Sequence, residues 1–310
     1  MKRREFLTKS ITATTSCLLG SQLALAEEKP PKMFNPYEIV PLGKTGIKTS
    51  RVGLGTGMRG GGGQSNHTRM GTEKFNALAR GSFERGIRLY DSADMYGTHP
   101  FLAEALKQMS RQDYVIVTKI SGSGRRRRRE QTPQSPDEIV KRFLKELNTD
   151  YIDVILMHAV SSPKWPGELT RQMEALEKLK KSGTIRAHGV SVHSLAAMEA
   201  CVKEAWVDYA LIRLNAYAVN MDVRAVEDIP KVEVLARQMR KLGKAVVGMK
   251  IIGEGRFRNS DERRDASVKL ALVSGCLDAM VVGCETIEEV EDLAGRVRKV
   301  PVPGELSKTA

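Results

Sequence analysis

The sequence predicts an α/β protein: a (β/α)8 TIM barrel, that is, a closed barrel of eight parallel strands, preceded by a short N-terminal β-hairpin. Short apolar runs alternate with amphipathic helix-like segments, which is typical of a parallel sheet covered on both faces. The strand-like runs number eight, the count of a closed barrel, and 310 residues can hold such a barrel in one domain. An open doubly wound sheet is the alternative on pattern alone.

The hairpin is expected within residues 38–50, as two short strands around the turn Gly43-Lys44-Thr45-Gly46. The eight predicted barrel strands then follow at residues 51–55, 88–90, 114–118, 152–157, 186–190, 209–214, 245–249 and 279–282.

Between these strands, apolar residues recur at intervals of three and four, which favours amphipathic helices. Two helices also have clear start signals. Ser135 precedes Pro136, and Thr286 precedes two glutamates, so each hydroxyl can accept a hydrogen bond from a free amide. The apolar sets are Phe75, Leu78 and Phe83; Leu102, Leu106 and Met109; Ile139, Phe143 and Leu147; and Met173, Leu176 and Leu179.

The N-terminus resembles a twin-arginine export signal. The Arg3-Arg4 pair precedes an apolar stretch diluted by Thr and Ser, which ends in the small-x-small pattern Ala24-Leu25-Ala26. The resemblance implies the twin-arginine export machinery as a partner, cleavage after Ala26, a periplasmic or exported mature protein, and no stable membrane span after cleavage. An uncleaved, anchored N-terminus is the alternative. The expected organisation is a signal peptide at 1–26, a linker at 27–37 and the barrel at 38–310.

The chain is basic, with a net charge of +13, and five of these charges lie in the run Arg125–Arg129. This run has no interleaved aromatic residues and matches no nucleic-acid-binding module, so a nucleic-acid partner is not expected. The run is either a solvated loop or a patch that steers an anionic substrate or cofactor toward the barrel mouth.

A metal site is not expected. Cys17 would leave with the signal, and Cys201, Cys276 and Cys284 form no CxxC pair. The five histidines show no HExxH spacing.

The glycines Gly55, Gly57 and Gly60 follow the first barrel strand in the spacing GxGxxG. We reject a dinucleotide-binding fingerprint here, because its third glycine must open a helix whose amides hold the pyrophosphate. Gly60 instead leads into Gly61–Gly63 and a polar segment. A flexible rim loop is the preferred interpretation.

Ionisable residues fall at the carboxyl ends of three neighbouring predicted strands, where barrel enzymes place catalytic groups. Asp91 follows the second strand, and Tyr96 comes five residues later. Lys119 ends the third strand and His158 the fourth. Each alone has a structural explanation, such as a helix cap or a loop anchor, but together they can converge on one mouth.

The pattern Asp91-x-Ala93-x-x-Tyr96-Gly97, followed by Lys119 and His158, resembles the aldo/keto reductases. LGKTGIKTSRVGLGT, LNTDYIDVILMH, KLKKSGTIRAHGVS and VVGCETIEEVED extend the resemblance over residues 38–295. It implies that a reduced nicotinamide gives hydride to a carbonyl carbon while Tyr96 protonates the carbonyl oxygen. Lys119 would lower the pKa of Tyr96, Asp91 would orient Lys119, and His158 would donate a hydrogen bond to the carbonyl.

The resemblance also implies residues that hold NADPH or NADH. Thr56 would lie near the nicotinamide, and Ser191 would bind its carboxamide. The residues that usually help this serine to bind the carboxamide are missing here. His193, Arg213 and Asn215 are the three candidates to replace them, and the choice among them stays open. The remaining expected cofactor residues are Met249 on the nicotinamide ring, Lys250 at the pyrophosphate, Gly283 and Thr286 at a phosphate-binding helix start, and Glu289.

Glu289 occupies the position at which NADPH-preferring relatives have a cation for the 2′-phosphate. A carboxylate repels that dianion, so NADH is expected to be accepted as well as or better than NADPH, unless Arg263 or Arg264 approaches from elsewhere. The expected substrate is a small-molecule aldehyde or ketone in an open pocket, with Trp165 and Tyr217 near it. Two alternatives are a cofactor-binding regulatory or scaffold protein with little turnover, and a Schiff-base lyase built on Lys119.

Overall fold

The computed structural model describes residues 31–121 and 134–304. The expected export signal at 1–26 and the Arg125–Arg129 run lie outside these residues. The other predicted elements fall within them.

Eight strands close into a barrel in the order β10-β3-β4-β5-β6-β7-β8-β9, so the predicted closed barrel is confirmed and the open sheet is excluded. All eight neighbouring pairs are parallel. The ring is closed where Val52 of β3 pairs with Met280 of β10. The strands are β3 (Val52–Gly55), β4 (Leu89–Asp91), β5 (Val115–Ser121), β6 (Ile152–Val160), β7 (Ile185–Val192), β8 (Tyr209–Arg213), β9 (Ala245–Met249) and β10 (Ala279–Val282).

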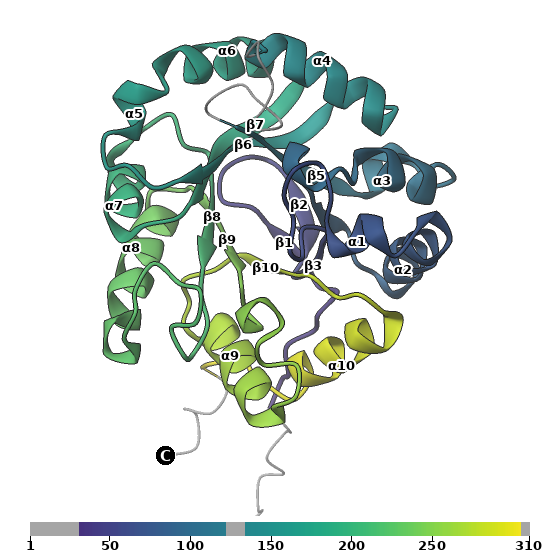
Figure 1. Cartoon of the computed structure of the whole chain (residues 1–310). Helices are drawn as coiled ribbons and strands as arrows, with labels where there is room; N and C mark the ends of the chain where they lie inside the picture. Colours follow the sequence, from purple (N-terminus) through teal and green to yellow (C-terminus); the bar gives the residue numbers. More distant parts are fainter. Residues whose placement is uncertain (1–30, 122–133, 305–310) are drawn as a thin grey trace, which may run out of the picture. The chain divides into compact units, whose positions relative to one another are not determined.

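Helices surround the barrel, as Figure 1 shows. The predicted apolar faces pack inward: Phe75 and Leu78 of α2, and Ile139 and Phe143 of α4, are all buried. Ser135 forms the expected cap, in a capping box with Glu138. The helices are α1 (Asn66–Arg69), α2 (Thr72–Arg85), α3 (His99–Leu106), α4 (Pro136–Leu147), α5 (Trp165–Glu168), α6 (Thr170–Lys181), α7 (Leu195–Lys203), α8 (Ile229–Lys241), α9 (Asp261–Val273) and α10 (Ile287–Val297), with 3₁₀ turns η1 (Asp94–Tyr96), η2 (Arg111–Asp113), η3 (Val226–Asp228) and η4 (Gly253–Gly255).

The hairpin of β1 (Ile39–Pro41) and β2 (Lys48–Ser50) is confirmed and closes the floor of the barrel. Leu42 and Ile47 are buried in one cluster with interior side chains of the strands. The turn fits tightly, because a Cβ at Gly43, which has φ +52°, would lie 2.5 Å from the Gly243 carbonyl oxygen. Ligands therefore have access to the barrel from the opposite end, where the strands terminate.

Residues 33–37, expected to belong to a linker, instead pack on the barrel. The Phe34 amide donates to the Val300 carbonyl (3.0 Å), and the Arg51 guanidinium lies 5.0 Å from the Phe34 ring centroid. Burial of the Phe34 ring explains why this part of the segment is ordered against the fold. Across the described ranges, none of the helices has the length and apolar character required to span a bilayer.

Candidate active site

The four predicted catalytic residues meet at the carboxyl end of the barrel. Asp91 is the last residue of β4, Lys119 lies on β5, His158 on β6, and Tyr96 ends η1. The Lys119 Nζ donates to Asp91 Oδ1 (2.6 Å) and to the Ser92 carbonyl (2.7 Å). The Tyr96 hydroxyl lies 3.4 Å from His158 Nε2. Parallel strands place their ends on one rim, which is why residues up to 67 positions apart converge.

Lys119 and Asp91 form a buried ion pair, with exposed fractions of 1% and 6%. Burial raises the pKa of Asp91 and lowers the pKa of Lys119, and their mutual attraction opposes both shifts. Removal of either partner would leave the other charge buried without compensation, which is strongly destabilising.

The structure corrects the expectation that Lys119 lowers the pKa of Tyr96. Burial raises the pKa of Tyr96, and the charges of Asp91 and Glu254 act in the same direction. The Lys119 ammonium lies 5.1 Å from the Tyr96 ring centroid and directs its hydrogen bonds to Asp91 and Ser92. Asp91 and the Ser92 carbonyl thus compensate the Lys119 charge, and Tyr96 remains protonated at neutral pH.

Two glycines make room for the Tyr96 ring, a role that the sequence did not reveal. A Cβ on Gly57 would lie 2.2 Å from Tyr96 Cε2, and one on Gly60 would lie 2.4 Å from Tyr96 Cδ1. Non-bonded carbons need about 3.5 Å. Gly57 and Gly60 of the GxGxxG spacing therefore let the Tyr96 ring lie directly against the backbone.

His158 is held in its neutral form. Burial lowers its pKa well below the usual value, and the charges of Lys119, His193 and Lys250 act in the same direction. A neutral imidazole has one N–H donor and one acceptor. Within the described ranges, His158 Nδ1 is buried without a hydrogen-bond partner. A proton on Nε2 would face the same space as the Tyr96 hydroxyl, so one oxygen atom could accept hydrogen bonds from both.

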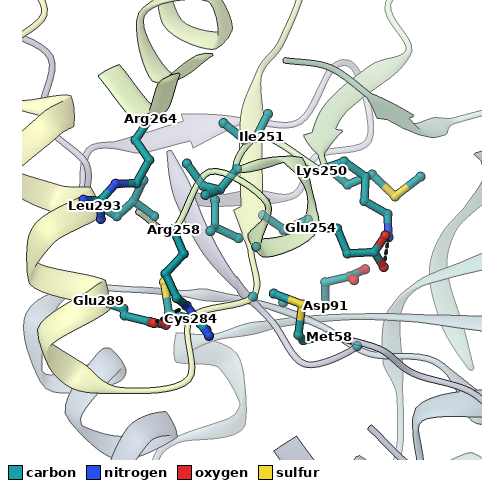
Figure 2. Close-up of a pocket in the computed structure, with 18 of the residues that line it drawn as sticks. Met58, Asp91, Lys250, Ile251, Glu254, Arg258, Arg264, Cys284, Glu289 and Leu293 are labelled. Atoms are coloured by element: carbon teal, nitrogen blue, oxygen red, sulfur yellow. Dashed lines mark hydrogen bonds and ion pairs between the residues drawn. The ribbon is translucent and has the colours of Figure 1, made fainter. Parts of the chain in front are cut away.

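A cavity of about 940 Å³, counting space open to solvent at its mouth, begins beside Asp91 and Tyr96 and extends toward α10. In Figure 2, Asp91 and Lys250 lie on one side of it, and Leu293 and Glu289 on the other. Its lining comprises Gly55, Gly57, Met58, Asp91, Tyr96, Met249, Lys250, Ile251, Ile252, Glu254, Gly255, Arg258, Arg264, Val281, Val282, Gly283, Cys284, Glu289, Asp292, Leu293 and Arg296. Four of the predicted cofactor residues, Met249, Lys250, Gly283 and Glu289, are among them.

Thr56, Thr286 and Asn215 do not line this cavity, because their side chains are bound within the fold. The Thr56 hydroxyl donates to the Asp91 carbonyl and also contacts Thr98, and Thr286 caps α10. The Asn215 amide donates to two backbone carbonyls and accepts from two backbone N–H groups, which uses all four of its hydrogen bonds. Asn215 therefore anchors its loop and has no free donor for a carboxamide.

Ser191 and His193 lie together near His158. The Ser191 Oγ is 3.4 Å from His193 Nε2, and the His193 and His158 ring centroids are 6.4 Å apart. Burial, with help from the Arg213 charge, lowers the pKa of His193 to about 4. Arg213 itself is bound to Asp222 and to the His193 carbonyl. Of the three open replacements, His193 is the one that remains available beside Ser191.

Trp165 does not face a substrate space. It is 1% exposed, its Nε1 donates to the Ala197 carbonyl (3.3 Å), and it contacts the Trp206 ring. Tyr217 packs edge-on against Phe257, and Arg263 lies over the Tyr217 ring. These two aromatic side chains pack within the fold, so the expectation that Trp165 and Tyr217 lie beside the substrate gains no support from their contacts.

Arg258 is a cavity residue that the sequence did not single out. It pairs with Glu285 (2.7 Å) and Glu289 (3.1 Å) across the start of α10. The predicted alternative cation Arg264 also lines the cavity, bound to Asp292 (2.8 Å) and Asp261 (2.5 Å). Arg258 lies in the irregular segment between η4 and α9, where no local sequence pattern would identify it. Within residues 31–121 and 134–304, no three His, Cys, Asp or Glu side chains are grouped as a metal site requires.

The barrel and its rim of Asp91, Tyr96, Lys119 and His158 define a TIM-barrel protein with a polar site at the strand ends. The model of the aldo/keto reductase family matches residues 51–302, so the chain belongs to that family.

Curated relatives include the aldo-keto reductase YhdN of Bacillus subtilis, 33% identical over 174 residues (52% of this chain and 49% of the relative). Another is the NADH-specific methylglyoxal reductase of Escherichia coli, 31% identical over 167 residues (49% and 51%). These alignments cover about half of the chain and about half of each relative.

Among solved structures, the holo form of an aldo-keto reductase from Bacillus halodurans matches with a TM-score of 0.67 at 21% identity, over 87% of this chain and 93% of that one. An aldo/keto reductase from Klebsiella pneumoniae, in complex with NADP and acetate, matches with a TM-score of 0.61 at 21% identity and the same coverage. At this identity the two structures support the fold.

Proposed function

We propose that the protein is an oxidoreductase that reduces an aldehyde or ketone with NADPH or NADH, and that Tyr96 is its proton donor. One observation carries the proposal: the Tyr96 hydroxyl lies 3.4 Å from Nε2 of the neutral His158, and Tyr96 also lines the cavity that extends toward α10. Family membership supports this assignment.

The residues fit a nicotinamide cofactor. The glycines Gly55 and Gly283 leave their part of the wall without side chains: a Cβ on either would reach within 3.4–3.6 Å of the opposite backbone. Along the same wall, Met249 offers a polarizable thioether, and Lys250 presents an ammonium group that is paired with Glu254 (2.6 Å). When bound, a reduced nicotinamide would supply the hydride that reaches the carbonyl carbon.

Side chains of the protein would bind and protonate the carbonyl oxygen of the substrate. The oxygen accepts hydrogen bonds from the Tyr96 hydroxyl and from His158 Nε2–H, which stabilises the negative charge that develops on it. The Tyr96 proton then moves to that oxygen, and the alcohol is complete. The resulting phenolate lies near the Lys119 ammonium, whose Nζ is 5.1 Å from the Tyr96 ring centroid.

The experiment measures turnover by the chain that begins at Glu27. Methylglyoxal serves as a reactive carbonyl probe, and the signal is the consumption of reduced nicotinamide. Tyr96→Phe removes the proton donor while keeping the ring, and we expect it to lower kcat by at least about 10²-fold. Tyr37→Phe is the matched control, because its hydroxyl lies outside the site. Equal rates in the wild type and Tyr96→Phe would refute the role of Tyr96, and tight cofactor binding without turnover would favour the scaffold alternative.

We also propose that the protein is exported with the twin-arginine machinery as its partner, and that its mature form is periplasmic or released. The Arg3-Arg4 pair and the Ala24-Leu25-Ala26 pattern support this. Mass spectrometry of the native protein should find Glu27 as its first residue, whereas an intact Met1 in all fractions would contradict cleavage.

A further inference from the structure

We infer that Arg142 of α4 is a positioning residue for the reaction. It holds the turn that carries Tyr96 and thereby sets the distance between the Tyr96 hydroxyl and His158. The inference rests on the proposed function, because it takes Tyr96 as the proton donor. Its basis is a bidentate ion pair between Arg142 and Asp94, the first residue of η1.

The turn η1 has few hydrogen bonds of its own. It comprises three residues and is closed by a hydrogen bond from the Tyr96 amide to the Ala93 carbonyl (2.9 Å). The position of so short a turn depends on the side chains that hold it from neighbouring elements. The Tyr96 hydroxyl lies 3.4 Å from His158 Nε2, which is longer than a typical hydrogen bond, so a small shift of η1 away from β6 would separate the two groups.

Arg142 holds Asp94 with both ends of its guanidinium group. Its Nη1 donates to Asp94 Oδ1 and its Nη2 donates to Asp94 Oδ2, each at 2.9 Å. The side chains of Arg142 and Asp94 are 23% and 3% exposed, so water competes little for the pair. Two parallel hydrogen bonds from a planar group fix both the distance and the orientation of a carboxylate, which a single ammonium group does not do. The position of η1 therefore follows that of α4.

A second set of contacts orients Arg142 and links α4 to the strand of Lys119. Arg142 Nη1 also donates to Glu146 Oε1 (3.0 Å), and His99 Nδ1 donates to Glu146 Oε2 (2.8 Å). Burial opposes ionisation of Glu146, but hydrogen bonds from His99 and Arg142 lower its pKa to about 2, so it is a carboxylate at neutral pH. His99 Nε2 contacts the Thr118 hydroxyl (2.7 Å), and Thr118 precedes Lys119 on β5. One chain of hydrogen bonds thus joins η1 to β5.

A matched ion pair at the opposite end of the barrel separates positioning from stability. Arg111 binds Asp153 (2.7 Å), which lies at the start of β6 rather than at its carboxyl end. The side chains of Arg111 and Asp153 are 19% and 0% exposed, close to the values for Arg142 and Asp94. Loss of the Arg111 pair should therefore destabilise the fold to a similar extent and leave η1 in place.

The test compares Arg142→Lys with Arg111→Lys in crystal structures, in thermal denaturation and in steady-state reduction of methylglyoxal. Lysine keeps the charge and loses the planar fork. We expect Arg142→Lys to move the Tyr96 hydroxyl at least about 0.5 Å farther from His158 Nε2 and to lower kcat at least about 10-fold, with less than about 3-fold change in the KM for reduced nicotinamide. Arg111→Lys should show a similar loss of Tm, an unchanged distance and a kcat within about 2-fold of the wild type. Equal kcat values in the two variants would overturn the inference.

Asp94→Asn tests the same pair from its other side, because one carboxylate oxygen becomes an amide nitrogen that cannot accept from the guanidinium group. We expect a loss of kcat similar to that of Arg142→Lys. The double variant should lose no more than either single variant, because the two residues act as one unit. A double variant whose loss is the product of the two single losses would contradict the inference. If Arg142→Lys is too unstable to assay, Asp94→Asn against Arg111→Lys decides the question.

The outcomes separate the inference from the proposed function. Displacement of Tyr96 in crystals of Arg142→Lys, in a protein whose wild type shows no turnover, would support the positioning role and refute the reductase. Turnover by the wild type with equal kcat in Arg142→Lys and Arg111→Lys would refute the positioning role and leave the reductase in place.

Discussion

Substitution of Gly57 by alanine should displace the Tyr96 phenol, the proposed proton donor, without removing it. The added Cβ would lie 2.2 Å from Cε2, 2.4 Å from Cζ and 2.7 Å from Cδ2 of Tyr96. A normal carbon contact needs about 3.5 Å, so the ring must retreat by more than about 1 Å. Displacement of this size costs on the order of 10²-fold in rate, because proton transfer depends on exact positioning. Overpacking of this kind also costs about 1–3 kcal/mol of stability.

The assay is steady-state reduction of a carbonyl probe, with kcat and KM determined separately and folding checked by circular dichroism. Gly61→Ala is the matched control: its Cβ would have no atom within 4 Å, and Gly61 is not among the glycines with positive φ. We expect Gly57→Ala to lose about 10²-fold in kcat and Gly61→Ala less than about 2-fold. Equal kcat values in the two variants, with both folded, would refute the proposal that Gly57 seats Tyr96.

Two further predictions concern stability. Arg142 makes two hydrogen bonds of 2.9 Å to the buried Asp94 in η1, so Arg142→Met should lower the free energy of unfolding by about 2–4 kcal/mol in urea titrations. Lys107→Met, at the exposed pair with Glu104, should lower it by less than about 1 kcal/mol, and similar losses in the two variants would contradict this prediction. Burial lowers the pKa of His193 from 6.5 to about 4. As the pH falls below 6.5, His193 of the unfolded chain therefore becomes protonated while His193 of the folded protein stays neutral. The protein keeps its full stability above pH 6.5 and loses stability as the pH falls toward 4. Thermal denaturation of His193→Gln between pH 7 and pH 4.5 should therefore show a smaller loss of Tm than the wild type, and identical pH dependence would exclude this role.

The sequence predicted the strands well because their signals are local. Runs such as Ala245–Met249 and Ala279–Val282 are short, apolar and bounded by turns, and the observed limits match the predicted ones. Helix caps are equally local: Ser135 and Thr286 both cap as expected. Because strands and helices alternate along the chain, few sheet topologies are possible. The presence of eight strands then favours the closed barrel over an open sheet.

Side-chain environments were less predictable, because they depend on distant residues. Nothing near Asn215 in the sequence indicates that its amide is saturated by the backbones of its own loop and of Lys250. The pKa of Tyr96 depends on burial and on how completely Asp91 compensates Lys119, both of which are three-dimensional quantities. Pairing of Arg258 with Glu285 likewise joins two loops that are 27 positions apart.

The pairing of β3 with β10 has a consequence for biosynthesis. β3 is synthesised before the other seven barrel strands, and one of its edges stays unpaired until Ala279–Val282 of β10 have been made. Until then, both β3 and β9 present open hydrogen-bonding edges, which are templates for pairing with other chains. Pairing of β10 with both β3 and β9 removes these two edges at once, so β10 is the strand that protects the finished barrel from edge-to-edge association.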